Sequence, residues 1–515
     1  MAVERKDLTG LSPLKGISAR PVRSMLVIIG VYLVLAVLFA VYTPAWQNPD
    51  EPAHYNYVKY LAEQYRFPVL KLGDYQGAYL WEIKAARFPP EMSIDPIRYE
   101  FHQPPLYYLL AAAVYRLFGG ALLPLRLLTA AIGAVLLVVV YWLVQEVAPR
   151  RPGLALAATA FIAWLPMHLA QSAAVGNDLL AELLLATIVL LAIRYLKMPV
   201  VGADGRRAVQ ALVVMGIATG LAFVTKSSIY VALPLAAAVI AARHLWLEER
   251  PFSGLALVKA LGWYLLPAAA LALPWWMRNM AQYGGLDLLG LQRHNQVVAG
   301  QLRTAQYLAA NGVANWLGNL GLTTFHSFWG QFGWMGVLLD ARLYQGLAIW
   351  SGVALTGLSA WAVSMWQQAR NGWRPARWQV AAGGLLVLLA LSSAAGYLWY
   401  NIQFVQYQGR YLFTALPAIG LAVAAGWREA LRRERAWLIA ALLIGGAVAV
   451  AVGSMLAGDM AKWPVLMLGG SGAAFLVRRL VPPRWDSLVE ALPYLVLIPL
   501  DVVCLFLFIV PQLTP

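Results

Sequence analysis

The chain has 515 residues, of which 61% are hydrophobic and only 12% charged, and its mean hydropathy is +0.64. A soluble protein of this length would carry about a quarter charged residues, so the composition excludes an ordinary soluble enzyme. The formal net charge of +15 does not indicate a nucleic-acid partner, because the basic residues lie mostly in short loops between apolar runs.

The first apolar run covers residues 24–43. It is long and is not followed by a small-residue cleavage site, so we expect a retained membrane helix and not a cleaved signal peptide. Basic residues are frequent in the preceding segment, 1–23, which places that segment in the cytoplasm. The adjacent carboxylates Asp50 and Glu51 then fall on the outer face of the membrane.

An outer segment follows over residues 44–121. Most of it is polar and proline-dotted, and its many aromatic residues are typical of helices that lie along the membrane surface. The run 105–120 could be a short span or a surface helix. If it spanned, the later arginine-rich loops would all fall outside, so the charge rule favours a surface helix.

Further apolar runs alternate with arginine-containing loops and give about 13 spans in total, with the C-terminus outside. They are interrupted by a second outer segment, 286–344, which is amphipathic and rich in Trp, Gly and Asn. The single cysteine, Cys504, excludes an intrachain disulfide. After the first span, we expect the others at residues 122–144, 153–170, 179–196, 209–224, 229–245, 255–276, 346–366, 380–399, 412–427, 438–456, 463–477 and 492–510.

The fold class predicted by this pattern is an all-α polytopic membrane protein with amphipathic surface helices in the two outer segments. It comprises one transmembrane module over residues 24–285 and a C-terminal transmembrane module over 345–515. Two acids fall inside expected spans, Glu182 and Asp501, and each should be paired or protonated.

Polar residues from distant parts of the chain collect at the outer ends of these spans. Ionisable groups at a membrane boundary are functional candidates, although Asp50 could instead cap the helix that follows it and Lys226 could reach to the headgroups. Cations at this level suit an anionic, lipid-linked substrate, and a carboxylate could take a proton from an acceptor hydroxyl. The residues of this face are Asp50, Glu51, His54, His102, Gln103, Asn177, Asp178, Lys226, Arg278, Asn279, Gln408, Gly409 and Arg410.

In order and placement, these residues resemble the GT-C superfamily of integral-membrane glycosyltransferases, in particular its family-39 type. That type includes protein O-mannosyltransferases and lipid A aminoarabinose transferases. The resemblance covers residues 24–420 and implies a GT-C fold. The matching elements are Asp50-Glu51, His-Gln-Pro-Pro-Leu-Tyr-Tyr at 102–108, Asn177-Asp178, Gly-Leu-Ala-Phe-Val-Thr-Lys at 220–226, Trp-Trp-Met-Arg-Asn at 275–279 followed by Tyr283-Gly284, and Gln-Gly-Arg-Tyr at 408–411.

The resemblance also implies a mechanism, in which an acceptor hydroxyl attacks the anomeric carbon of a sugar carried on polyprenyl phosphate. Polyprenyl phosphate is already a good leaving group, so one carboxylate as base suffices for an inverting displacement. We assign Asp50 as the base, with Glu51 and Asp178 holding it or orienting the acceptor. The expected phosphate ligands are Lys226, Arg278, Arg410 and His102, and the other expected substrate contacts are His54, Gln103, Tyr107, Asn177, Asn279 and Gln408.

The chain departs from family-39 transferases at one place. These often carry a basic residue directly before Pro-Pro-Leu, where this chain has His102 and Gln103. The departure favours a generic sugar transferase over an aminoarabinose-type enzyme. The resemblance implies no required cofactor, although a divalent metal held by Asp50, Glu51, His54 and Asp178 stays an alternative.

We therefore expect a multi-pass protein of the plasma (inner) membrane whose site faces the outside or the periplasm. Its partners would be the polyprenyl-phosphate sugar, membrane lipids and an acceptor that the sequence does not identify, whether lipid, glycan or protein. The alternative function is a transporter or flippase of a lipid-linked sugar, which would need a midplane site and paired repeats. The polar residues lie at one face instead, and no internal repeat is visible.

Overall fold

The structure is a computed structural model, and it describes residues 19–198, 205–248 and 251–514. As the sequence predicts, the described residues are mainly helical; residues 1–18 of the expected cytoplasmic segment lie outside them. A short antiparallel pair is formed by β1 (Gln331–Phe332) and β2 (Val337–Leu338).

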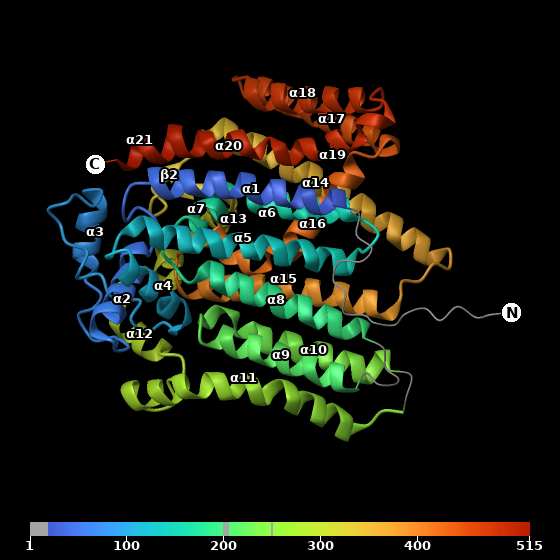
Figure 1. Cartoon of the computed structure of the whole chain (residues 1–515). Helices are drawn as coiled ribbons and strands as arrows, with labels where there is room; N and C mark the ends of the chain where they lie inside the picture. Colours follow the sequence, from blue (N-terminus) through green and yellow to red (C-terminus); the bar gives the residue numbers. More distant parts are fainter. Residues whose placement is uncertain (1–18, 199–204, 249–250, 515) are drawn as a thin grey trace.

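The first half of the chain forms a bundle of long helices that run side by side (Figure 1). Its centre is α8 (Asp178–Lys197). The most apolar 18-residue stretch of α8 is 78% buried, whereas that of α11 (Gly254–Tyr283), at the edge, is 22% buried. The other helices of this bundle are α1 (Ala19–Tyr42), α5 (Leu122–Val147), α6 (Pro152–Ala163), α7 (Pro166–Ser172), α9 (Gly205–Phe223), η1 (Ser227–Val231), α10 (Ala232–Ala242) and η2 (Arg243–Leu247).

The second half completes the bundle and adds a helical hairpin outside it. α15 (Arg377–Gln403) packs against α8, and α16 (Leu416–Ala430) packs against α6 and α14 (Ala341–Arg370). The hairpin is formed by α17 (Arg433–Leu456) and α18 (Lys462–Arg478). The remaining elements of this half are η3 (Gly409–Ala415), η4 (Pro483–Trp485), α19 (Asp486–Leu495), α20 (Leu497–Val503), η5 (Cys504–Ile509) and α21 (Val510–Leu513).

The number of possible spans agrees with the polytopic prediction. Within the described ranges, 11 helices are long and apolar enough to cross a membrane, or 12 if a bent pair counts as one span. The predicted span at 463–477 corresponds to α18, which has 17 residues. At about 1.5 Å per residue it is slightly shorter than a bilayer core of about 30 Å.

One predicted span is not a single straight helix. The expected span at 153–170 consists of α6 and α7, which are bent by 67°. Pro166 begins α7, and proline lacks the N–H and clashes with the carbonyl of the preceding turn, so α6 ends before it. The bend turns α7 toward the end of the bundle where the candidate site lies.

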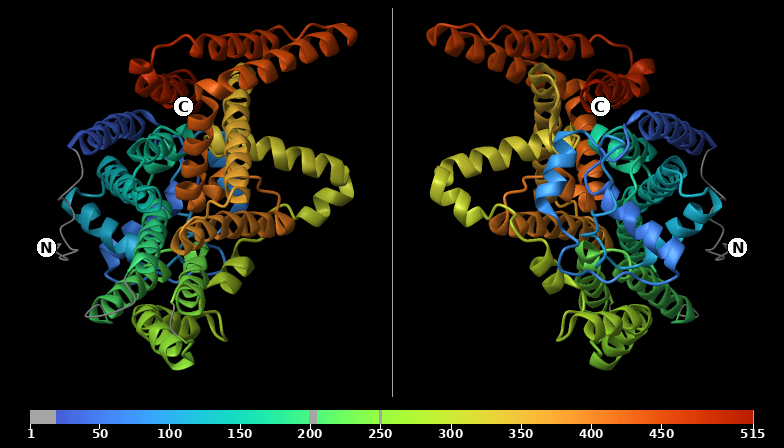
Figure 2. Two further views of the ribbon diagram at one scale, coloured as in Figure 1. Left: turned by 90° about the vertical axis from the view of Figure 1, so that its right-hand side faces the viewer. Right: turned by 90° about the vertical axis from the view of Figure 1, so that its left-hand side faces the viewer.

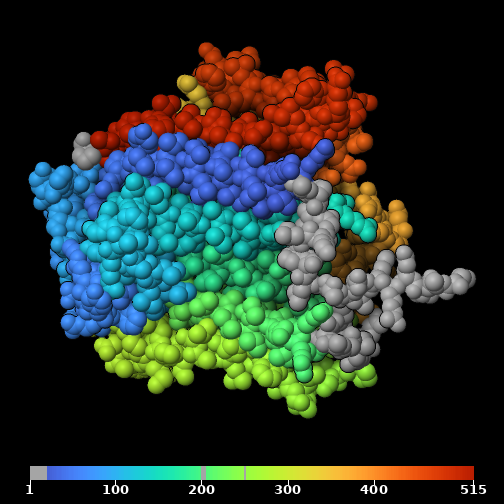
Figure 3. Space-filling model, in the orientation of Figure 1, coloured from blue at the N-terminus to red at the C-terminus, as the bar shows by residue number. Residues whose placement is uncertain are grey.

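The outer segments form surface helices. Those of the first segment cover one end of the bundle (Figures 1 and 3). We call this end the α2 end. α4, the helix of the ambiguous run at 105–120, has 12 residues, so its length of about 18 Å is too short to span a bilayer. The helices of the two segments are α2 (Glu51–Gln64), α3 (Gly77–Ala85), α4 (Leu106–Leu117), α12 (Leu291–Val297) and α13 (Thr304–Trp329).

α13 differs from the other surface helices because it projects sideways from the bundle (Figure 2). It bends at Gly312, whose φ of 75° lies in the left-handed region that favours glycine. Its C-terminal half returns to the bundle, where Ser327 and Trp329 are buried. That half contacts η3, which carries Arg410.

Candidate active site

Asp50 lies at the α2 end, in the connection between α1 and α2. It precedes the first residue of α2, but its side chain makes no capping hydrogen bond. Its carboxylate instead accepts a hydrogen bond from the Tyr99 hydroxyl at 2.8 Å and pairs with Arg410 at 2.9 Å. The backbone φ of Asp50 is 69°, a left-handed conformation that aspartate tolerates better than most residues. The capping interpretation of Asp50 therefore finds no support in its contacts.

Arg410 is brought to Asp50 by a close approach of two chain segments. Gly409, directly before it, packs so tightly on α13 that a Cβ atom there would lie 2.4 Å from the carbonyl oxygen of Thr324. The Gly409 N–H also donates to the Ser327 hydroxyl at 2.7 Å. Gln408 accepts a hydrogen bond from Arg410 Nε at 2.7 Å, which orients the guanidinium toward Asp50.

These contacts keep the Asp50 carboxylate ionised. Burial of the carboxyl group acts to raise the pKa of Asp50, but Arg410, His54 and the Tyr99 hydrogen bond outweigh burial and hold the pKa below its usual value. Tyr99 responds in the opposite direction, because burial and then the charge of Asp50 raise its pKa well above the usual value. The phenol therefore stays neutral and acts as a hydrogen-bond donor.

A second ion pair lies beside the first. Asp178, the first residue of α8, pairs with Lys226 at 2.5 Å. The side chains are partly exposed, by 20% for Lys226 and 32% for Asp178. With Asp50 and Arg410 they form a group of two carboxylates and two cations, which we call the four-charge cluster.

A small cavity adjoins the cluster. Its volume is about 20 Å³, which is about the room of one water molecule. Its lining includes His54, whose Nδ1 lies 2.7 Å from the Tyr108 hydroxyl, and Gln171, whose Oε1 is buried without a partner in the described residues. Asp178 and Arg410 also line it, so each ion pair contributes one residue to the cavity wall.

Glu51 lies apart from this cluster, although it follows Asp50 directly. Its carboxylate is fully buried and receives two hydrogen bonds from Arg126, at 2.8 and 2.6 Å. The backbone N–H groups of Trp46 and Val175 donate to it as well. Arg126 in turn donates to the carbonyl oxygens of Ala40, Thr43 and Pro44. This arrangement ties the end of α1, the start of α2 and α5 together and leaves little capacity for a substrate.

Three expected substrate contacts take part in hydrogen bonds within the protein. Asn177 donates to Gln103 Oε1 at 3.3 Å and to the Thr225 carbonyl at 3.1 Å, and its own Oδ1 has no partner among the described residues. The Tyr107 hydroxyl lies 2.9 Å from Thr129 and accepts from the Gly176 N–H at 3.1 Å. These bonds fix the loop before Asp178.

Two further expected site residues, Arg278 and Asn279, lie beside a neighbouring loop. Arg278 donates to the Pro68 carbonyl and to Asn279 Oδ1, and its guanidinium lies 4.6 Å from the Trp275 ring centre. Asn279 is buried and donates to the Leu288 carbonyl. Both residues therefore hold loops at the α2 end through contacts that do not include the four-charge cluster.

His102 is buried against a second histidine. Its ring centre lies 4.4 Å from that of His294, and its Nδ1 lies 3.1 Å from the Tyr99 carbonyl. Burial and then His294 lower the pKa of His102 well below its usual range. His102 is therefore neutral at pH 7. Its Nδ1 can bond to the Tyr99 carbonyl only as a donor, so Nε2 is left as an acceptor and does not suit a phosphate.

The structure adds residues that the sequence analysis did not single out. Arg126 could have been found by the argument applied to Arg410, because it too is an arginine at the outer end of an apolar span. Glu100 is 9% exposed and its Oε2 has no partner within the described ranges. Tyr99 gave no signal, since its bond to Asp50 depends on a tertiary contact alone. Tyr108 belongs to the motif at 102–108, but its contact with His54 could not be predicted for the same reason.

The two acids inside the spans differ from each other. Glu182 pairs with His168 at 3.1 Å in the buried interior, as expected of a paired acid. Asp501 is fully buried, and neither of its carboxylate oxygens has a partner among the described residues. The described part of the chain contains no group of three or more His, Cys, Asp or Glu side chains arranged to hold a metal ion.

Comparison with protein families identifies a match within the chain. Residues 102–269 match the family model of dolichyl-phosphate-mannose-protein mannosyltransferases. That segment includes Asp178 and Lys226 of the four-charge cluster and excludes Asp50 and Arg410. No curated protein matches the chain in sequence.

Solved structures are similar over most of the chain. ArnT from Cupriavidus metallidurans in the apo state has 16% identity and a TM-score of 0.51, covering 95% of this chain and 77% of that one. ArnT bound to undecaprenyl phosphate has 15% identity and a TM-score of 0.49, with coverage of 95% and 76%. The apo oligosaccharyltransferase of Archaeoglobus fulgidus has 12% identity and a TM-score of 0.47, and the match covers 87% of this chain but 56% of that one.

The family-model match and the similarity to apo ArnT confirm the resemblance to GT-C membrane glycosyltransferases. The similarity to apo ArnT extends over 95% of this chain and shows the fold. The family model independently matches residues 102–269 of the chain. At these identities the structural likeness shows the fold alone, so the donor, the acceptor and the residue roles have to be argued from the site.

Proposed function

We propose that this membrane protein transfers a sugar from a polyprenyl-phosphate donor to an acceptor hydroxyl, with inversion at the anomeric carbon. The observation that carries the proposal is the four-charge cluster at the α2 end of a GT-C fold, in which each ion pair contributes one residue, Arg410 or Asp178, to the lining of one cavity. It combines a carboxylate for proton transfer with two cations for a phosphate. Those are the groups that this reaction needs.

The donor phosphate would be bound by Lys226 and Arg410. Both cations are paired with carboxylates in this structure, at 2.5 and 2.9 Å. A phosphate offers them a second anion, and arginine can bind it through two hydrogen bonds. As the bond between the anomeric carbon and the phosphate oxygen breaks, negative charge grows on the leaving phosphate, and the two cations stabilise it.

Asp50 would take the proton of the acceptor hydroxyl. Its depressed pKa keeps it unprotonated before the reaction, and it becomes a better base when Arg410 turns toward the phosphate, because the opposite charge that lowers its pKa is then shared. The attacking oxygen forms a bond to the anomeric carbon, its proton passes to Asp50, and polyprenyl phosphate leaves with the bonding electrons.

The site must open before a sugar can enter. A cavity of about 20 Å³ is far smaller than the pockets of about 300 Å³ or more that hold small-molecule ligands. The ion pairs that contribute to its wall are the parts that a phosphate would separate. Donor binding and opening are therefore coupled in this proposal.

The expected roles of the other residues are adjusted by their contacts. Glu51 forms a buried ion pair with Arg126 directly beside Asp50 in the chain, so we propose it as a positioning residue. Asp178 remains a candidate for orienting the acceptor, because it lines the cavity. Arg278 and Asn279 would act on the donor only through the loops that they hold.

We place the site on the outer or periplasmic face of the plasma membrane. The basic segment before α1 and the arginine-rich loops at the opposite end of the bundle support a cytoplasmic N-terminus. The acceptor stays open between a lipid, a glycan and a protein. A metal ion is not required by the residues assigned to this reaction.

The test uses purified protein in nanodiscs with a panel of polyprenyl-phosphate monosaccharides, and it measures free polyprenyl phosphate. We expect release with one donor by the wild type, and release by Asp50→Asn lowered by about 10²- to 10⁴-fold, the range for loss of a general base. Equal release by both proteins would remove Asp50 from the chemistry. A flippase would instead move an intact donor between leaflets without releasing any polyprenyl phosphate.

A further inference from the structure

The α17–α18 hairpin leans away from the rest of the molecule (Figure 2). Its two helices interlock closely, since a Cβ atom on Gly472 would lie 2.6 Å from the Ile444 side chain. Large apolar side chains on its surface are uncovered, including Trp437 at 56% exposure and Leu466 at 64%. In a bilayer, these surfaces face lipid and not protein.

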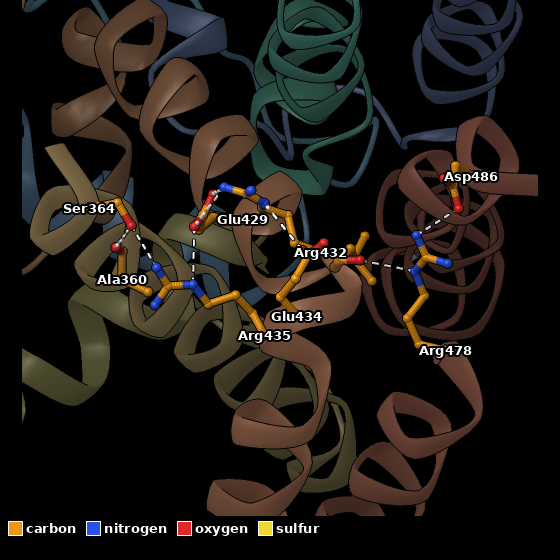
Figure 4. Close-up of polar contacts among 9 residues, drawn as sticks. Ala360, Ser364, Glu429, Arg432, Glu434, Arg435, Arg478 and Asp486 are labelled. Carbon is orange, nitrogen blue, oxygen red and sulfur yellow. Dashed lines mark hydrogen bonds and ion pairs between the residues drawn. The ribbon is translucent and has the colours of Figure 1, made fainter. Parts of the chain in front are cut away.

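The base of the hairpin lies at the end of the bundle opposite Asp50 and is held by a polar network (Figure 4). Glu429 of α16 forms ion pairs with Arg432 and Arg435, both at 3.2 Å. Arg435 also donates to Ser364 of α14 at 2.6 Å, and Arg478 of α18 donates to Asp486 of α19 at 2.8 Å. Both acids, Glu429 and Asp486, are therefore already paired with arginines.

Positive charge at the base exceeds negative charge. The segments 428–435 and 478–490 together contain seven arginines and four acids, an excess of three positive charges. The guanidinium groups of Arg479 and Arg484 are exposed and have no ion-pair or hydrogen-bond partner in the part of the chain that the structure describes. Arg478 is 6% exposed, and its Nη1 is buried without a partner there.

Aromatic side chains place this base at the level of lipid headgroups. Trp437, one turn into α17, and Trp485, beside α19, are 56% and 48% exposed. Exposed tryptophans next to arginines at the ends of apolar helices are typical of a membrane–water interface. The arginines of the base are therefore at the depth where phospholipid phosphates lie.

We propose that the base of the hairpin binds the headgroup of an anionic phospholipid, whose acyl chains run along the apolar hairpin surface toward the α2 end. Guanidinium groups pair with phosphate through two hydrogen bonds, and basic sites between membrane helices bind anionic headgroups. An excess of three positive charges favours a lipid with net negative charge over a zwitterionic one.

The lipid site is independent of the proposed sugar transfer. It lies at the opposite end of the bundle from Asp50 and shares no residue with the four-charge cluster (Figure 1). The side chains of Arg479 and Arg484 make no hydrogen bond or ion pair within the described residues. Their substitution should therefore change the lipid site without destabilising the fold. Loss of lipid binding and loss of sugar transfer can therefore be observed separately.

The experiment titrates delipidated protein in detergent with phosphatidylglycerol or with phosphatidylethanolamine of the same acyl chains, and it counts bound lipids by native mass spectrometry. We expect the wild type to prefer phosphatidylglycerol and the double variant Arg479→Gln/Arg484→Gln to lose about tenfold or more of that affinity. Its affinity for phosphatidylethanolamine should not change. Absence of a preference in the wild type would overturn the proposal, as would an unchanged affinity in the variant.

The matched control is Arg150→Gln/Arg151→Gln. These two arginines are exposed in the α5–α6 connection at the same end of the bundle, so the charge change is identical. An equal loss of phosphatidylglycerol binding in this control would show general surface attraction and overturn a site at the hairpin.

If the glutamine variant is not monodisperse, Arg479→Lys/Arg484→Lys is used for the test instead. It keeps the charge but cannot bind phosphate with two planar hydrogen bonds, so affinity should fall a few-fold, and an unchanged affinity would count against the site.

Discussion

Asp50 and Glu51 are neighbours in the chain but belong to two different regions of the molecule. Glu51 lies in a closed region, where Arg126 and two backbone N–H groups use both of its oxygens and its exposure is 0%. Asp50 lies in an open region, where its side chain is 31% exposed and is held by one phenol and by Arg410, which lines a cavity. The first arrangement stabilises the fold, and the second keeps a charged group available for a ligand.

The difference teaches how to separate structural from functional acids at a membrane boundary. Both acids gave the same signal in the sequence, because both are costly to place there. What separates them is whether every hydrogen-bonding position is already used by the protein. The four predictions that follow test this distinction, beginning with the largest expected effect.

Substituting Arg126→Met should destabilise the protein by about 3–5 kcal/mol, the usual cost of leaving one partner of a buried ion pair uncompensated. The change also removes the donors to three backbone carbonyl oxygens near the end of α1. Thermal unfolding in detergent measures the effect, with Arg410→Met as the matched control in the open region. A similar loss in both variants would mean that Asp50–Arg410 is structural as well.

Substituting Lys226→Gln or Arg410→Gln should lower kcat/KM for the donor by about tenfold to a hundredfold, because a charge-assisted contact to the phosphate is lost. The unfolding temperature of the Lys226→Gln variant should change little, since Lys226 and its partner Asp178 are partly exposed and screened by solvent. Arg278→Gln is the control among the expected phosphate ligands, as its guanidinium is held by Pro68 and Asn279. An equal rise in donor KM in all three would return Arg278 to the phosphate site.

The sequence carried much of this picture, because hydropathy and charge act locally. The apolar runs predicted most ends of the long helices to within a few residues. The arginine-rich loops predicted that α4 does not span the membrane. The roles of Glu51 and Arg278 could not be read in the same way. Their partners, Arg126 and Pro68, are 75 and 210 residues away in the chain, and only the folded bundle brings them together.

Glu100 provides a third acid that lies between the two extremes. It is buried like Glu51, but its Oε2 has no partner in the described residues. Its charge adds to burial in raising the pKa values of Tyr99 and Tyr108. Glu100→Gln removes an uncompensated charge at constant volume, so we expect stability to rise by about 1 kcal/mol. Thermal unfolding measures it, and a loss of stability would reveal a partner for the carboxylate that only the assembled membrane protein provides.

The smallest expected effect is in the pH dependence of donor turnover. Arg410 and His54 hold the pKa of Asp50 below its usual value, so the carboxylate form is present at neutral pH and is lost only as pH falls through that lowered pKa. The rate should then stay flat from neutral pH down to about pH 5, because free aspartate titrates near 3.9. In Arg410→Gln the main charge that lowers the pKa is absent, so the acid limb of kcat/KM should move to higher pH. The control is Arg278→Gln, whose acid limb should stay at the wild-type position. An acid limb that does not move in Arg410→Gln would mean that another group titrates, and Asp178 would become the first candidate because it lines the cavity together with Arg410.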